Sequence, residues 1–231
     1  MFFPENTNNE YIIKSDYRGY GGETSSSSTV RTHLYSLNEK KVKQIFYNYY
    51  QDHDDYGKSG EDIGSIGHLL VWHNEKNNNY YILQFANKII ISNIFIKNEP
   101  VHNLCYEAKN GFIYNKGDNK QKNSYLCIAT DYSIDIIDLY DKECIKSIRG
   151  DFNNRLPVHQ WSNKYIIAID GYSWEKEKIL KIIDLENNKV ISKIEEGHTN
   201  KIMYIKKIYH PIYGESLLTG QENGTIKLWV I

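Results

Sequence analysis

A fixed spacing between apolar positions is the feature that most constrains the fold of this 231-residue chain. When the segments "NKIIISN", "DYSIDIIDL", "KEKILKIIDL" and "NGTIKLWVI" are aligned, Ile91, Ile137, Ile183 and Trp229 share one place, each 46 residues from the next. Repeats of about 40–45 residues are typical of proteins in which each unit is a small four-stranded β-sheet. Since one such sheet cannot bury its own faces, the spacing predicts an all-β protein of successive packed sheets.

The period extends to both sides of these segments. An earlier unit, "TVRTHLYSLNEKKVKQIF", has the same strand, turn and strand form and puts Tyr35 at the repeated position, with a step of 56 residues that requires an insertion. The links "DLYDKECIKSIRG" and "DLENNKVISKIEEG" both read as a strand end, a charged turn, an apolar outer strand and a glycine. Gly150 and Gly197 are therefore equivalent in this alignment.

The last 35 residues carry the most specific pattern. Gly197 and His198 precede an alternating strand, "KIMYIKKIYHP", which ends in a proline turn, and "SLLTG" follows as a buried strand. Asn223-Gly224 suits a tight turn in which both residues have positive φ, and "TIKLW" returns as the third strand. This layout resembles one blade of the WD-repeat (WD40) β-propeller family.

The resemblance implies a structural hydrogen-bond tetrad formed by His198, Thr219, Asn223 and Trp229. The family usually has Asp at the place of Asn223, and replacing a charged acceptor weakens the bond to the histidine. Upstream the resemblance rests on the period alone, because Asp151 replaces the histidine and isoleucine replaces the tryptophan. There the continuous apolar runs "YIIAI", "ILKII", "YLCIAT" and "KIIIS" predict inner strands covered on both faces.

These patterns predict a β-propeller of four-stranded antiparallel blades. We expect an N-terminal tail over residues 1–9 and one domain over 10–231, with an acidic insertion loop at 49–63 and blades at about 10–48, 64–107, 110–150, 155–196 and 197–231. The strand count is three, then three groups of four, then three, so the first and last of the five blades are incomplete. A closed five-blade ring and a partial or open ring completed by another chain both remain open.

Composition restricts the class of partner. A net charge of −1, with 28 basic and 29 acidic residues, gives no electrostatic attraction to nucleic acid or to anionic membranes. No apolar run approaches the ~20 residues of a membrane span, and "MFFPENTNNE" lacks the features of a signal peptide. We therefore expect a cytoplasmic or nuclear protein. Three cysteines, Cys105, Cys127 and Cys144, then read as reduced core thiols.

Local motifs do not predict catalysis, a metal site or a cofactor. Gly57 to Ser59 lacks the first glycine and the strand-to-helix context of a phosphate loop, and the segment from Asp52 lacks two oxygen donors of a calcium loop. The histidines His33, His53, His68 and His73 have no zinc-binding spacing. If the chain were a propeller enzyme instead, Asp131 and Asp170 would line the central channel.

The expected function is a non-catalytic scaffold or adaptor that binds other proteins or peptides through the loops on one propeller face. Aromatic side chains are enriched at interface hot spots, so the candidate anchors are Tyr132, Tyr172 and Trp174. The candidate polar rim consists of Asn154, Arg155, Asn200 and Glu222. The alternative is a propeller fragment that functions only after completion by another chain, or by self-association through the open last blade.

Overall fold

The computed structural model shows an all-β chain that divides into two compact units, residues 1–104 and 105–231. Each unit is described by itself. The structure describes residues 11–21, 26–52, 69–85, 89–95, 102–104, 106, 108–116, 123–153, 156–162, 164–171, 178–195 and 197–230. The expected tail at residues 1–9 lies outside these ranges.

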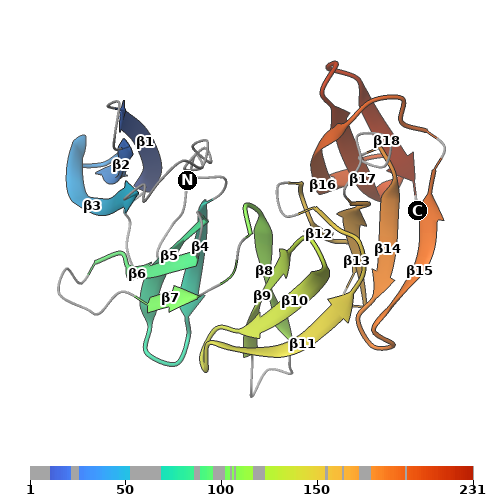
Figure 1. The fold of residues 1–231 in the computed structure, drawn as a ribbon, viewed down its shortest axis with the longest axis horizontal. Helices are drawn as coiled ribbons and strands as arrows, with labels where there is room; N and C mark the ends of the chain where they lie inside the picture. Colours follow the sequence, from blue (N-terminus) through green and yellow to red (C-terminus); the bar gives the residue numbers. More distant parts are fainter. Residues whose placement is uncertain are drawn as a thin grey trace. The chain divides into compact units, whose positions relative to one another are not determined.

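The described residues of the first unit form two antiparallel sheets (Figure 1). Sheet A consists of β1 (Tyr11–Gly21), β2 (Ser26–Ser36) and β3 (Lys41–Asp52), in that order. Sheet B consists of β4 (Leu69–Asn74), β5 (Asn79–Phe85), β6 (Ile89–Asn93) and β7 (His102–Leu104). The two sheets share one buried cluster, to which sheet A contributes Tyr11 and Leu34 and sheet B contributes Tyr80, Ile82 and Ile94.

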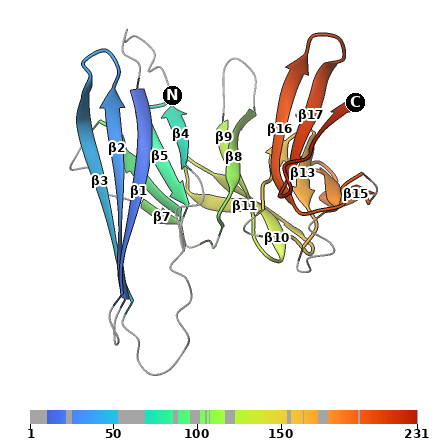
Figure 2. The same ribbon diagram turned by 90° about the horizontal axis from the view of Figure 1, so that it is seen from above.

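The second unit contains three antiparallel sheets (Figures 1 and 2). Sheet C consists of β8 (Gly111–Lys116), β9 (Asn123–Ala129), β10 (Ser133–Asp138) and β11 (Glu143–Arg149). Sheet D consists of β12 (His159–Gln160), β13 (Tyr165–Ile169), β14 (Leu180–Asp184) and β15 (Lys189–Ile194). Sheet E consists of β16 (Ile202–His210), β17 (Gly214–Gln221) and β18 (Ile226–Val230). Within the described residues, the expected sequence of three, four, four, four and three strands is confirmed.

Sheet D is covered on both faces. Along β13, Ile166 and Ala168 join the buried cluster shared with sheet C, whereas Ile167 and Ile169 join the cluster shared with sheet E. Neighbouring side chains of a strand point to opposite faces, so a strand between two other sheets must be apolar at every position. This confirms the prediction drawn from the continuous run "YIIAI".

A turn with the same geometry recurs between the last two strands of sheets A, C and D. Lys40, Lys142 and Asn188 have positive φ angles of 52°, 62° and 56°. Six residues before each of them, the pairing register shifts by a β-bulge, between Leu34 and Tyr35, Ile136 and Ile137, and Ile182 and Ile183. Positive φ is uncommon for residues other than glycine, and a β-bulge is a local feature that marks a particular position in a strand pair. Their shared spacing makes Tyr35, Ile137 and Ile183 equivalent positions.

The alignment of sheet B is wrong by one residue. Ile94 N donates to Tyr80 O, as Leu139 N donates to Ser124 O in sheet C, so Ser92 rather than Ile91 occupies the position of Ile137. The step is therefore 45 residues. An apolar run such as "KIIIS" fixes the existence of a strand but not its register, because both faces are buried (all of β6 is buried).

Two local expectations also differ from the structure. The acidic loop is expected at 49–63, but β3 continues to Asp52, and residues 53–63 lie outside the described ranges. At Asn223-Gly224 only Gly224 has positive φ, 83°. Gly224 N donates to Gln221 O, and Gln221 N to Thr225 O, so the loop is one residue longer than a two-residue turn and needs a single left-handed position.

Candidate functional site

In the second unit, three connections between strands meet, and backbone hydrogen bonds join two of them. Gly150 N donates to Tyr132 O at 2.9 Å and Phe152 N donates to Asp131 O at 3.1 Å, which joins the β9–β10 loop to the β11–β12 connection. Gly171, the second residue of the β13–β14 loop, approaches the same connection so closely that a Cβ there would lie 2.9 Å from the carbonyl carbon of Asp151. We name the described residues of these three connections, 130–132, 150–153 and 170–171, the loop face.

A buried ion pair fastens the loop face to the sheets. Lys181 on β14 binds the Asp170 carboxylate, and the side chains are 5% and 3% exposed. The same ammonium group donates to Asp151 O and lies 4.7 Å from the centroid of the Phe152 ring. Lys193 on β15 adds a second cation 3.5 Å from Asp170 Oδ2. One lysine therefore ties the β11–β12 connection to the base of the β13–β14 loop.

Opposing effects act on the Asp170 carboxyl group. Burial disfavours its charged form, but the hydrogen bonds from Lys181 and Gly171 N and the charges of Lys181 and Lys193 outweigh burial. The pKa of Asp170 consequently lies below its ordinary value, and the group is an ionised structural partner of Lys181. It does not line an open channel, as was expected for an enzyme, because the residue is only 2% exposed.

The predicted contact residues have different surroundings. Tyr132 projects from the loop face with 70% of its surface exposed. Glu222 is exposed and its backbone N donates to Lys201 O, whereas the Asn200 side chain is half-buried and accepts from Lys201 N. Four further candidates lie outside the described residues: Tyr172, Trp174, Asn154 and Arg155.

The sequence reasoning missed Gln221, which orders the β15–β16 and β17–β18 connections. Its Oε1 accepts from Asn200 N at 3.0 Å and lies 3.5 Å from Thr199 Oγ1. The side chain is buried, with the residue 6% exposed. The only signal in the sequence was an amide residue at the end of a buried strand, which is too common to single out.

Three of the four tetrad residues are brought together in sheet E. Trp229 Nε1 donates to Thr219 Oγ1 at 2.8 Å, and His198 Nε2 lies 2.9 Å from the same oxygen. Thr219 is fully buried and the His198 and Trp229 rings lie 5.3 Å apart. Gly197 has φ +121°, and a Cβ there would lie 2.5 Å from Trp229 Cη2, so the glycine is required for the ring to fit.

Asn223 does not join this chain of hydrogen bonds. Its Oδ1 accepts from Thr225 N at 3.1 Å within the exposed turn, and His198 Nδ1 has no hydrogen-bond partner among the described residues. Burial, with a smaller effect of the Lys227 charge, lowers the pKa of His198, so the ring is held neutral.

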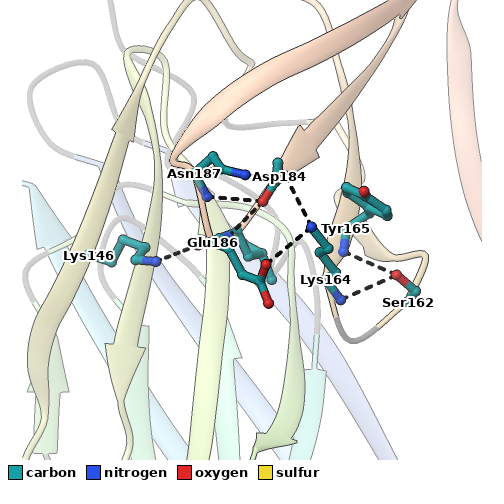
Figure 3. Close-up of polar contacts among 8 residues, drawn as sticks. Lys146, Ser162, Lys164, Tyr165, Asp184, Glu186 and Asn187 are labelled. Carbon is teal, nitrogen blue, oxygen red and sulfur yellow. Dashed lines mark hydrogen bonds and ion pairs between the residues drawn. The ribbon is translucent and has the colours of Figure 1, made fainter.

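At the β14–β15 turn, a polar cluster fixes the backbone (Figure 3). Asp184 Oδ1 accepts from Glu186 N at 2.8 Å and Asn187 N at 3.0 Å. The hydrogen bonds from the Asn187 backbone and side chain, together with that from Glu186, lower the pKa of Asp184. Lys164 pairs with Glu186 at 3.2 Å, and Lys146 of sheet C donates to Leu185 O. At the equivalent turns, the Asp138 and Ser36 side chains accept hydrogen bonds from backbone N–H groups three residues later. Asp184 therefore has a structural role in the repeat.

The surface also carries an open depression of about 450 Å³ lined by Trp161, Ser162, Tyr165, Tyr213 and Glu215. Its walls come from sheets D and E. Among these lining residues, Glu215 supplies the one carboxylate, and they include no cluster of ionisable groups suited to acid–base chemistry.

Cysteine positions differ partly from the expectation of core thiols. Cys127 is buried, which raises the pKa of its thiol, whereas Cys144 is exposed on β11 and is not a core residue. Cys105 lies outside the described residues. Within the described ranges there is no group of three or more His, Cys, Asp or Glu side chains that could hold a metal ion. Those same ranges contain no apolar helix of the length required for a membrane crossing.

Comparison with known proteins adds no assignment: neither protein-family models nor curated proteins give a match to this chain.

Proposed function

We propose that the chain is a non-catalytic interaction scaffold whose five sheets are blades of a WD-repeat-like β-propeller and whose loop face binds other proteins. Consecutive sheets pack face to face in each unit, and in sheet E the Trp229–Thr219–His198 hydrogen bonds match the interior of such a blade. The strand edges of small, closely packed sheets are short, so recognition in this architecture falls to the loops.

The observation that carries this proposal is the set of contacts that hold the described residues of the loop face in place. Its connections are held by backbone hydrogen bonds and by the buried Lys181–Asp170 pair, while Tyr132 stands 70% exposed on the same surface. An ordered loop loses less conformational entropy on binding than a mobile one. A tyrosine is a large amphipathic anchor with few rotatable bonds, which suits a hot spot of a protein interface.

Comparative affinity capture tests the proposal. Residues 1–231 carrying Tyr132→Ala should lose a discrete set of captured proteins, with dissociation constants raised about thirtyfold or more if the tyrosine is a hot spot worth about 2 kcal/mol. Tyr209→Ala is the matched control, because Tyr209 is 78% exposed at the end of β16, away from the loop face.

The control variant should retain the full set of captured proteins. Identical capture by the Tyr132 and Tyr209 variants, in composition and in affinity, would reject Tyr132 as an anchor.

A further inference from the structure

The contacts between consecutive sheets follow one rule in three places. Sheets A, C and D each contact the following sheet through one face. The residues of this face that belong to the shared buried clusters are Leu34 in sheet A, Ile134 and Ile136 in sheet C, and Leu180 in sheet D. We name this the forward face. The following sheet meets it with its rear face, to which Ile183 in sheet D and Trp229 in sheet E belong. Forward faces therefore bind rear faces.

The forward face of sheet E is exposed although it carries the same kind of residues. Ile226 and Leu228 stand 46 residues after Leu180 and Ile182 and pair with Gly220 and Leu218 of β17. Ile226 is 67% exposed, Val230 55% and Leu228 37%. Tyr204 of β16, opposite Gly220, extends the same face and is 47% exposed. In sheet D, Leu180, the equivalent of Ile226, lies in the buried cluster shared with sheet E.

The rear face of sheet A also carries apolar side chains that are only partly buried. Tyr35 occupies the position of Ile183, as the shared bulge shows, and pairs with Ile12 on one side and Val42 on the other. These three side chains form one row on the face opposite Leu34. Val42 is 45% exposed, and Tyr35 and Ile12 are half-buried. Sheet A thus presents an apolar row of the type that a forward face covers elsewhere in the chain.

We infer that this protein self-associates, with the forward face of sheet E in one copy packing on the rear face of sheet A in a second copy. The contact continues the sheet-to-sheet packing already present between sheets C and D and between D and E. A contact between two unlike faces of the same chain can be made twice in a two-fold symmetric dimer, and this is the assembly that we propose. Two contacts formed together dissociate far more slowly than one. The inference is independent of the loop face, which neither contact uses.

Solution mass measured against concentration tests this inference. For purified residues 1–231, light scattering from about 1 to 100 μM should give twice the chain mass of 27.1 kDa. Ile226→Lys places a charge at the centre of the contact and should raise the dimer dissociation constant at least a hundredfold, since an unpaired buried charge costs several kcal/mol. Because Ile226 is 67% exposed, the substitution should leave the monomer folded, which far-UV circular dichroism checks.

Two further variants separate the faces from general surface effects. Ile212→Lys is the matched control: the same substitution at a residue 79% exposed in the β16–β17 turn should leave the dimer intact. Val42→Lys should dissociate the dimer as Ile226→Lys does, and Val230→Lys replaces Ile226→Lys if that variant does not fold. Capture through the loop face should survive in all of them, so failure of this inference is distinguishable from failure of the proposed function.

Three results would overturn the inference. The first is a wild-type mass of one chain over the whole concentration range. The second is a dimer that tolerates Ile226→Lys as well as it tolerates Ile212→Lys. The third is a dimer that dissociates with Ile226→Lys but not with Val42→Lys, which would mean that sheet E contacts itself and that sheet A is not the receiving face.

Discussion

Replacement of Thr219 by valine isolates the polar chain inside sheet E, because valine has nearly the same shape but no hydroxyl group. Thr219 is fully buried, and its oxygen is shared by Trp229 Nε1 at 2.8 Å and His198 Nε2 at 2.9 Å. Valine also has a high β-strand propensity, so the substitution should leave the backbone conformation of β17 unchanged. The substitution therefore changes hydrogen bonding with little change in packing.

The expected cost follows from the two partners. The half-buried indole of Trp229 can regain some hydration, so its lost bond should cost about 1 kcal/mol. His198 is 5% exposed and already has an unpartnered Nδ1 within the described residues, so isolating Nε2 should cost about 1–3 kcal/mol. Together Thr219→Val should lower the free energy of unfolding by about 2–4 kcal/mol.

Urea unfolding followed by circular dichroism measures this loss. With a slope of about 2 kcal/mol per molar urea, the midpoint should fall by roughly 1–2 M. Thr225→Val, at an exposed position of the neighbouring turn, is the control and should change stability by less than about 0.5 kcal/mol. In a double-mutant cycle, Trp229→Phe should cost about 1 kcal/mol less in the Thr219→Val background than in the wild type. Equal, small effects at positions 219 and 225, or strict additivity with Trp229→Phe, would refute the argument.

Three other perturbations address different parts of the structure. Asp170→Asn leaves the Lys181 charge buried and should cost about 3–5 kcal/mol in urea unfolding, with part of the loss restored by Lys181→Met; no recovery in the double variant would show that the pair is not the cause. Gly197→Ala should cost more than about 2 kcal/mol because of its φ of +121° and the clash with Trp229, whereas Gly214→Ala, with φ +75° and open space, should cost only about 1 kcal/mol; equal losses would contradict this. Burial lowers the pKa of His198, so the unfolded chain takes up its proton first, and stability should fall as the pH drops below about 6.5. The urea midpoint between pH 8 and pH 5 should be less pH-dependent in His198→Gln, and an unchanged slope would rule out this contribution.

The arrangement of strands could be read from the sequence because the repeat imposes it several times. The 46-residue spacing of Ile137, Ile183 and Trp229, the proline turn after β16 and the two-sided apolar runs gave the five sheets and their strand numbers. The register of sheet B was misjudged because all of β6 is buried, so its pattern does not distinguish Ile91 from Ser92.

The candidate site was less accessible to sequence reasoning. The buried Lys181–Asp170 pair joins a residue at the end of β13 to one at the start of β14, and a lysine inside an apolar run gives no hint that its charge points toward a loop. Asn223 fits the family pattern by type, but its side chain accepts from Thr225 N and does not reach His198 Nδ1. Contacts of this kind depend on loop geometry, which the repeat does not specify.

The central claim is that the five sheets form the blades of a propeller, and an experimental structure of residues 1–231 by crystallography or electron cryo-microscopy tests it most directly. The account predicts that consecutive sheets pack forward face on rear face about a common axis, with His198, Thr219 and Trp229 bonded as described in sheet E. Sheets paired instead into separate two-layer sandwiches, or a sheet E without the Trp229–Thr219 hydrogen bond, would contradict it.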